Sequence, residues 1–169
     1  IIQQAERTGL PLQLIAIPFP CSDDEYKKIM GDFIEQAKSQ EIDSIAFGDL
    51  FLEGIRSYRE ENLAGTGIKP LFPLWGIPTN ELSKEMVRGG LRAKVTCIDP
   101  KHLPAEFAGH EYDNSFLEKI PNNVDPCGEN GEFHSFVYDG PMFHGKVNVC
   151  LGETVTRDGF MFTDLLPGE

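Results

Sequence analysis

Apolar residues in the first half of the chain form two short runs separated by an amphipathic segment. Residues 12–17 are almost continuously apolar, which predicts a strand covered on both faces, as in a parallel sheet, and residues 42–47 are predicted as a second buried strand. Between them, Ser22 and Glu25 have the spacing of a capping box, and apolar residues then recur at helical intervals up to Ala37. The order strand, helix, strand predicts a crossover unit in a doubly wound α/β sheet.

The chain starts with the end of a predicted helix. Residues 1–8 lead to Gly9, a typical helix stop, with Leu10 and Pro11 beyond it. Neither an N-cap residue nor an initiator methionine precedes this segment. We therefore expect the chain to begin inside an element of a longer protein.

A second helix is predicted over residues 53–63. Gly48 and Asp49 precede it, directly after the second predicted strand. In open α/β sheets, ligands bind beyond the carboxyl ends of the strands, so this position is a candidate binding site. The prolines of residues 70–76 predict a packed connector in place of a regular ladder, with Trp75 in the core.

The pattern of apolar and polar positions changes after Gly76. A helix capped by Thr79 is expected first, and residues 91–97 then alternate between apolar and polar, which predicts a strand with one solvated face. This change places a domain boundary near Gly76. Residues 1–76 form the predicted α/β domain, and residues 77–169 form a smaller α+β domain.

The rest of the second domain contains three further predicted elements. A short helix over residues 114–119 follows Asp113 as its cap, and residues 133–138 have the composition of a strand. Near the end of the chain, Asp158 and Gly159 separate two alternating runs and predict the turn of a hairpin.

Charge excludes some partners. The 169 residues include 27 acidic and 15 basic side chains, for a formal net charge of −12. Such a surface repels phosphate backbones and anionic lipid, so we expect neither a nucleic-acid nor a membrane partner. No apolar run approaches the length of about 20 residues that spans a bilayer, and a cytoplasmic location is expected.

The four cysteines are widely separated and include no CxxC pair, which indicates free thiols. Cys127 lies between Pro126 and Gly128, beside the most charged loop of the second domain. Its sequence context leaves two interpretations open, a reactive thiol and a small buried side chain.

Residues 125–134 concentrate the candidate chemistry. Glu129, Asn130, Glu132 and His134 lie among glycines just before a predicted strand. This arrangement suits hydrogen bonds to a polar or cationic substrate, and a carboxylate here is placed to take a proton from an attacking amine. Two alternatives remain: a tight turn with solvated acids, and a metal site that would require Glu129 to fold back toward the other ligands.

Arg56 and Arg59 lie three residues apart on the predicted helix, so their side chains are neighbours on its surface. Two guanidinium groups at this spacing suit the binding of one anion. The alternative is pairing within the helix, with Glu53 and Glu60 as partners of Arg56.

Two long stretches carry a family resemblance. Residues 47–76, with Gly48-Asp49, the two arginines and the proline-rich segment, resemble the PP-loop ATPase family that includes diphthine–ammonia ligase. Residues 128–141 resemble the carboxy-terminal signature of that family. The resemblance implies an α/β fold: an incomplete adenine-nucleotide α-hydrolase-like (Rossmann-like) parallel sheet, followed by the smaller α+β domain, with the active site between the two domains.

The family chemistry implied is ATP-dependent amidation. A substrate carboxylate attacks the α-phosphate, pyrophosphate leaves, and ammonia displaces AMP; Mg²⁺ is expected to neutralise the polyphosphate. Residues 1–76 would be the remainder of the nucleotide-binding domain and residues 77–169 the substrate-binding domain. The residues implied are Gly48, Asp49, Arg56 and Arg59 for the nucleotide, Glu129 and Glu132 for catalysis, and Glu129, Asn130, Glu132 and His134 for the substrate.

The sequence departs from the family pattern in two places. No Ser-Gly-Gly-Lys-Asp-Ser type of phosphate loop is present, and Gly89-Gly90 does not replace it. Either this loop precedes Ile1 in the full protein, or the protein does not cleave ATP by the family route. The second departure is Asn130 in place of a glycine and His134 in place of an acid, which resembles the bacterial branch and leaves the carboxylate substrate open.

The sequence therefore predicts an ATP-dependent amide ligase acting on a carboxylate and ammonia. Two alternatives from other classes are a catalytically inactive nucleotide-binding sensor or assembly module and a purely structural oligomerisation protein. Formation of a homo-oligomer is left open.

Overall fold

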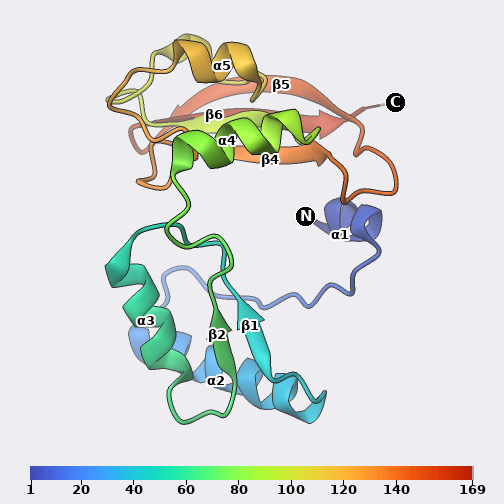
Figure 1. Cartoon of the computed structure of the whole chain (residues 1–169), viewed down its shortest axis with the longest axis vertical. Helices are drawn as coiled ribbons and strands as arrows, with labels where there is room; N and C mark the ends of the chain where they lie inside the picture. The colour runs from blue at the N-terminus through green and yellow to red at the C-terminus, as the bar shows by residue number, and fades with distance from the viewer. Residues whose placement is uncertain (169) are drawn as a thin grey trace. The chain divides into compact units, whose positions relative to one another are not determined.

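The computed structural model describes residues 1–168, and the chain forms two compact units (Figure 1). One unit comprises residues 13–76, and the other comprises residues 77–169 together with residues 1–12. The sequence pattern grouped residues 1–12 with the first domain, but their contacts join them to the second unit. No helix within residues 1–168 is both long and apolar enough to span a bilayer.

Helix α1 (Ile2–Thr8) holds the start of the chain against the second unit. The Gln4 side-chain amide donates to the Val137 carbonyl at 2.7 Å, and the His144 N–H donates to the Arg7 carbonyl at 2.7 Å. The helix ends at Gly9 as predicted, with φ at 69° in the left-handed region that favours glycine.

The unit of residues 13–76 is built on a pair of parallel strands, β1 (Ser44–Ala46) and β2 (Lys69–Leu71). Helix α2 (Asp23–Ser39) precedes β1, and α3 (Glu53–Leu63) connects the two strands. The predicted capping box of α2 is confirmed, since the side chain of Ser22 accepts from the Glu25 N–H and the Glu25 carboxylate accepts from the Ser22 N–H.

The predicted strand over residues 12–17 is wrong. This segment has no ladder partner in the described structure, and Leu12, Leu14 and Ile17 are 41–64% exposed. Its apolar composition is that of a buried strand, but a strand also needs a neighbour to pair its backbone groups. The crossover unit is instead β1–α3–β2, so the architecture is mixed α/β with one parallel and one antiparallel sheet.

The proline-rich connector also differs from the prediction, because Pro70 lies within β2 and pairs with Ile45. The Lys69 N–H donates to the Asp43 carbonyl at 2.9 Å, and the Phe47 N–H donates to the Leu71 carbonyl at 2.8 Å. In a parallel ladder, the residue between two hydrogen-bonded positions points its N–H away from the neighbouring strand. Pro70 occupies such a position in β2, so its missing N–H removes no hydrogen bond to β1.

The second unit contains an antiparallel sheet in the order β4-β3-β6-β5. Its elements are α4 (Thr79–Arg88), β3 (Arg92–Ile98), the 3₁₀ turn η1 (Ala105–Phe107), α5 (Asn114–Lys119), β4 (Phe133–Asp139), β5 (Val149–Arg157) and β6 (Phe160–Pro167). The Asp113 cap of α5 and the final hairpin are confirmed; Asp158 and Gly159 both have positive φ, at 51° and 86°. Thr79 is not a cap, because it is already the first helical residue of α4.

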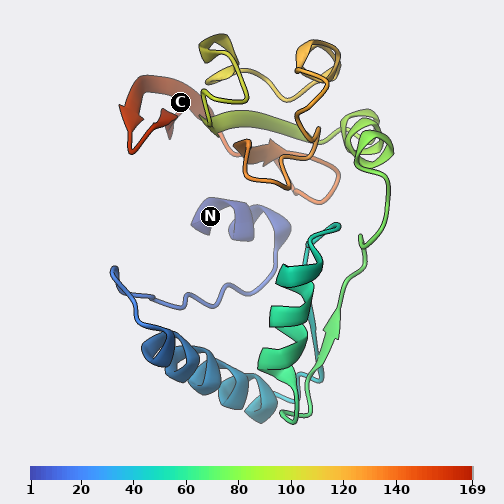
Figure 2. The same ribbon diagram turned by 90° about the vertical axis from the view of Figure 1, so that its left-hand side faces the viewer.

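The core of this unit packs one face of the sheet against α4, α5 and η1. Phe116 of α5 is fully buried at its centre, with ring centroids of Tyr112 and Phe133 both at 5.2 Å. Figure 2 shows α1 on the opposite side of the sheet from α5. The predicted alternation in β3 is confirmed, since Ala93 and Val95 are buried in the core while Arg92 is exposed.

Leu103→Ala tests this core against a matched surface change. Leu103 is fully buried in the cluster, so the substitution should lower the free energy of unfolding by about 2–5 kcal/mol through lost burial and a cavity. Leu10→Ala, at a side chain 68% exposed, should change it by less than about 0.5 kcal/mol. Urea unfolding followed by circular dichroism measures both; equal effects would contradict the assignment of Leu103 to the core.

Candidate functional site

The charged loop before β4 is organised around a buried carboxylate. Glu132 is only 3% exposed, and its two oxygens accept three hydrogen bonds from the loop itself. The donors are the Asp125 N–H at 2.9 Å, the Asn130 N–H at 3.1 Å and the Asn130 side-chain amide at 3.0 Å. The Glu132 carbonyl accepts from the Asp99 N–H at 2.8 Å, which joins the loop to the end of β3.

Two glycines allow the loop to close around this carboxylate. Gly128 and Gly131 have φ at 70° and 83°, a conformation that side chains rarely adopt. A Cβ atom on Gly128 would also lie 2.8 Å from the Phe133 carbonyl oxygen. A second carboxylate, that of Asp125, accepts from the Glu129 N–H at 2.9 Å and fixes the backbone of Glu129.

The four residues that the sequence grouped as one candidate site have different environments in the structure. Glu132 and Asn130 bond to each other inside the loop, which gives Glu132 a clear structural task. Glu129 is half-buried on the same loop, whereas His134 is exposed on β4. The structure thus brings Glu129, Asn130 and Glu132 together, and it places His134 among the residues of a separate cavity on the sheet.

Hydrogen bonding controls the charge of Glu132. Burial raises the pKa of its carboxyl, but the bonds from Asp125 and Asn130 favour the ionised form and outweigh burial, so the pKa lies below its ordinary value. Glu132 is consequently a carboxylate at neutral pH. A proton acceptor with a lowered pKa is a weak base, which favours a positioning role over proton transfer.

Cys127 lies in the same loop and is half-buried. Its Sγ approaches the Thr79 carbonyl at 3.5 Å, and the neighbouring Tyr112 hydroxyl donates to the Pro126 carbonyl at 2.8 Å. Burial, together with the charges of Asp125 and Glu129, raises the pKa of the Cys127 thiol to about 11. The interpretation as a small buried side chain is the one that this environment supports.

The other candidate residues lie in the unit of residues 13–76. Asp49 follows β1, and its Oδ2 lies 3.6 Å from Nε of Arg59 on α3. Both atoms are buried, and neither has a hydrogen-bond partner among the described residues. The Arg59 guanidinium also lies 5.1 Å from the centroid of the Phe47 ring. These two buried atoms of a half-buried ion pair therefore retain unused hydrogen-bonding capacity.

Arg56 has a different environment from Arg59. Its Nε donates to Glu60 at 2.8 Å, which is the pairing within the helix that the sequence left as an alternative. Its guanidinium lies 4.8 Å from the ring centroids of both Phe72 and Trp75. The two arginines are thus held by different groups, and sequence reasoning missed these aromatic partners because they come from other segments of the unit.

Gly48, the residue before Asp49, has open space at its own Cβ position, because a Cβ atom placed there would meet no other atom within 4 Å. Among the described residues no group of three or more His, Cys, Asp or Glu side chains gathers at a metal-binding distance.

Comparison with known proteins gives two concordant results. The sequence matches the family profile of the diphthamide synthase C-terminal domain over residues 78–163. It is 31% identical to diphthine–ammonia ligase of Danio rerio over 175 residues, a match that covers 94% of this chain and 68% of the relative. The enzymes of the same name from Bos taurus and Homo sapiens are 30% and 27% identical, each with 94% of this chain and 65% of the relative covered. The chain thus spans about two thirds of the length of these relatives.

Glu132→Gln tests the organising role of the buried carboxylate. The amide presents a donor to N–H groups that need acceptors, so the free energy of unfolding at pH 7 should fall by about 1–3 kcal/mol. The difference from the unmodified protein should be complete above pH 4.5, the ordinary pKa of the carboxyl, and should shrink as pH falls through the lower pKa of the folded state.

The matched control is Glu153→Gln, which removes the same charge from an exposed position on β5. Urea unfolding at several pH values measures both variants. Equal stability of the two variants at pH 7 would contradict the role assigned to Glu132.

Alkylation by iodoacetamide at pH 7.5 tests the state of Cys127. A pKa of about 11 against an ordinary 9.0 lowers the thiolate fraction about a hundredfold, so Cys127 should be labelled far more slowly than the exposed Cys150. Peptide mapping by mass spectrometry measures each rate. Labelling of Cys127 as fast as Cys150 would contradict a half-buried thiol that is protonated at this pH.

Proposed function

Because this chain belongs to the diphthine–ammonia ligase family, we propose that the full-length protein is an ATP-dependent ligase that forms an amide from a carboxylate and ammonia. The match of the family profile to residues 78–163 and the identity over most of the chain support the proposal. The same proposal includes the fold. Residues 13–76 would be part of an adenine-nucleotide α-hydrolase-like domain, and residues 77–169 would form the substrate domain.

The observation that carries the nucleotide half of the proposal is the half-buried pair of Asp49 and Arg59. Both side chains lie at the carboxyl end of β1, where parallel sheets bind ligands, and each keeps a buried polar atom without a hydrogen-bond partner among the described residues. Such atoms are costly unless a ligand or water completes them. Gly48, next to Asp49 in the chain, has open space at its own Cβ position. These residues therefore fit a nucleotide.

ATP would supply the leaving group of the reaction. In the proposed sequence a carboxylate oxygen displaces pyrophosphate from the α-phosphorus, and ammonia then replaces AMP at the acyl carbon. Arg56 and Arg59, both on α3, would place positive charge near the phosphates. The ring of Phe72 contacts the Arg56 guanidinium and the ring of Phe47 contacts the Arg59 guanidinium, which restricts the positions of both groups. Mg²⁺ would bind chiefly through the phosphates, because this ion is commonly held by one or two carboxylates plus phosphate oxygens.

The substrate half of the proposal rests on the loop of residues 125–132. We propose that the Glu129 carboxylate contacts the substrate and takes a proton from the attacking ammonia. The backbone N–H of Glu129 is held by the Asp125 carboxylate, and the backbone N–H of Asp125 is held in turn by Glu132. Asn130 completes the proposed substrate contacts of the loop, whereas the substrate contact predicted for His134 stays a prediction because His134 lies at the separate cavity. The relatives are named diphthine–ammonia ligases, so diphthine is the first carboxylate substrate to test here.

The proposal predicts that full-length protein given ATP, ammonium and the carboxylate substrate releases AMP and pyrophosphate. Release of ADP and phosphate would contradict attack at the α-phosphorus. Nucleotide binding by calorimetry with a nonhydrolysable ATP analogue separates catalysis from sensing, because binding without turnover favours the nucleotide sensor. The absence of binding would contradict both functions.

The same calorimetry tests the role proposed for Arg59. Arg59→Ala should weaken binding of the analogue at least about fivefold, the effect of losing a charge-assisted hydrogen bond. Arg157→Ala, at an exposed arginine on β5 of the other unit, is the matched control and should leave affinity unchanged. Equal affinities would remove Arg59 from the proposed site.

A further inference from the structure

Strand β5 is an open edge of the sheet in the second unit. Within residues 1–168 it pairs only with β6, and it stands last in the order β4-β3-β6-β5. The strand at the other edge, β4, is partly covered, because the Tyr138 carbonyl accepts from the Val147 N–H at 2.7 Å. Four side chains near the end of β5 are exposed: Glu153, Thr154, Thr156 and Arg157. A strand edge of this kind can pair with a further strand.

Two irregularities limit the part of β5 that is free to pair. The register between β5 and β6 shifts between Leu151 and Thr154, which marks a bulge, and the turn of residues 158–159 ends the strand. A bulge bends its strand and interrupts regular pairing. The regular part between the bulge and the turn is residues 154–157, each of which has a partner on β6. A new strand would therefore have to align with this short segment.

The turn after β5 fixes the hydrogen-bond pattern of the final hairpin. Residues 158–159 are a two-residue loop, and both have positive φ. In such hairpins the residues on either side of the loop form a hydrogen-bonded pair, which here is Arg157 and Phe160. Hydrogen-bonded and non-hydrogen-bonded pairs alternate along an antiparallel ladder. The pair of Val155 and Phe162 is therefore of the hydrogen-bonded type as well.

Thr154 and Thr156 flank Val155, so their backbone N–H and C=O groups point away from β6. The side chains agree with this assignment. The Thr154 and Thr163 hydroxyls are 2.9 Å apart, and paired side chains lie closer together at non-hydrogen-bonded positions. The open edge of β5 therefore presents the N–H and C=O groups of Thr154 and Thr156.

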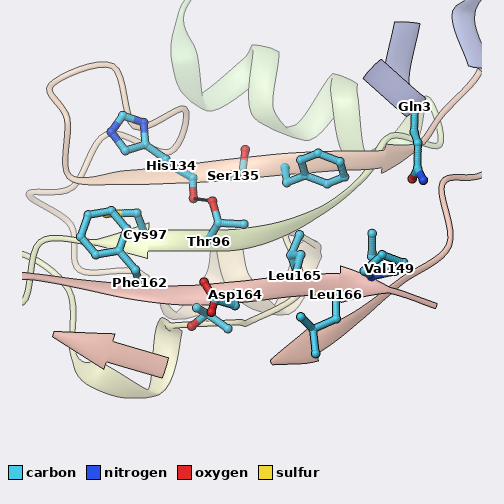
Figure 3. Close-up of a pocket in the computed structure, with 13 residues that line it drawn as sticks. Gln3, Thr96, Cys97, His134, Ser135, Val149, Phe162, Asp164, Leu165 and Leu166 are labelled. Carbon is cyan, nitrogen blue, oxygen red and sulfur yellow. Dashed lines mark hydrogen bonds between the residues drawn. The ribbon is translucent and has the colours of Figure 1, made fainter. Parts of the chain in front are cut away.

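Glu153, Val155 and Arg157 lie on the face of the sheet opposite the core. Figure 3 shows Phe162 among the residues that line the cavity of about 590 Å³ on this face. Val155 pairs with Phe162, and paired residues project to the same face. Successive side chains of a strand alternate between faces, so Glu153 and Arg157 share the face of Val155. The Arg157 guanidinium, 5.8 Å from the centroid of the Phe162 ring, agrees with this placement.

The charges of β5 suit a second copy of the same strand. When two copies lie antiparallel about a two-fold axis at Val155, Glu153 of each copy is opposite Arg157 of the other. Thr154 then faces Thr156 of the second copy, so the backbone groups that point to the edge pair with each other. This register provides two cross-strand ion pairs and about four backbone hydrogen bonds. Opposite charges at directly opposed positions stabilise a strand pair.

Other registers of the same two strands lose these ion pairs. An axis at Thr154 would place Glu153 opposite Val155, and an axis at Thr156 would place it opposite Gly159. An axis at Glu153 would bring two Glu153 carboxylates face to face, which is destabilising. The formal charge of −12 opposes association of two copies in general, whereas residues 153–157 carry one acid and one base. Charge therefore favours the axis at Val155.

We propose that β5 pairs with β5 of a second copy about a two-fold axis at Val155 and so joins two four-stranded sheets into one. The contact uses only a few residues of each copy, which makes it smaller than a standard interface, and a dissociation constant on the order of 100 μM is expected. The pairing uses neither nucleotide nor carboxylate substrate. It therefore goes beyond the proposed ligase reaction and stands or fails separately from it.

Disulfide cross-linking of the full-length protein tests the register. In a Cys150→Ser background, Val155→Cys places two thiols directly opposite each other across the axis, at a separation that a disulfide spans. Thr156→Cys is the matched control, because its two copies are about 8 Å apart between Cα atoms, beyond the reach of a disulfide. Mild oxidation followed by non-reducing electrophoresis should give cross-linked dimer at least about tenfold faster for Val155→Cys.

Charge reversal tests the ion pairs in the same Val155→Cys protein. Glu153→Arg and Arg157→Glu each place like charges opposite each other, so each should slow cross-linking about fivefold or more. The double variant restores opposite charges and should recover the rate. Glu106→Arg makes the same charge change at an exposed position on η1 and should leave the rate unchanged. Circular dichroism confirms that each variant is folded.

Sedimentation velocity on protein with its natural cysteines gives a measurement that does not depend on the cross-link. Runs at about 10–500 μM cover both sides of the expected dissociation constant. Association should rise with concentration, fall in Glu153→Arg and return in the double reversal.

Three outcomes would overturn the proposal. Equal rates for cysteines at positions 155 and 156 would mean that the strands do not meet at Val155. A Val155→Cys rate no higher than that of the Cys150→Ser background would mean that β5 does not pair with itself, even if the protein associates through another surface. A double reversal as slow as the single ones would mean that Glu153 and Arg157 are not opposed.

Discussion

A carboxylate enclosed by its own loop is the constraint on which the second unit depends. Once Glu132 is buried, its oxygens need hydrogen-bond donors, and the nearest ones are the backbone groups of Asp125 and Asn130. Satisfying them fixes the path of the loop, and the Glu132 carbonyl ties that path to the end of β3 through Asp99. The adjacent Phe133 then enters the core. Loop geometry and core packing are therefore coupled at one residue.

The unit of residues 13–76 holds its charged side chains in a different way. Its two arginines carry their charge over aromatic rings, Arg56 over Phe72 and Trp75 and Arg59 over Phe47. A guanidinium stacked on a ring is held in place without using most of its N–H donors. Arg56 uses one donor on Glu60, whereas the Arg59 Nε and Asp49 Oδ2 remain unbonded within the described part of the chain. These two unbonded atoms are the ones that the proposed nucleotide site would use.

The second unit presents two chemically different surfaces. The loop of residues 125–132 offers the carboxylates of Asp125 and Glu129 on a backbone held rigidly by hydrogen bonds. The cavity on the sheet offers one carboxylate, Asp164, on a mostly apolar surface. His134 belongs to the sequence motif of the loop but lies at the cavity. A motif that is continuous in sequence is thus divided between two environments, because β4 begins within it.

Local patterns in the sequence determined most of the secondary structure. The capping box at Ser22, the cap at Asp113 and the turn at Asp158 and Gly159 each depend on residues a few positions apart, and each was predicted correctly. The family resemblance likewise rested on contiguous residues, and the profile match over residues 78–163 confirms it.

Only the tertiary structure decided which groups were already occupied by partners distant in sequence. Periodicity reads an apolar run such as residues 12–17 as a strand, but it does not supply the neighbouring strand that pairing requires. Spacing placed Arg56 and Arg59 side by side, but the rings that hold them come from outside the helix. Burial gives Glu132, which the sequence predicted as a catalytic group, a further task as the organiser of its loop, and burial depends on the packing of the whole unit.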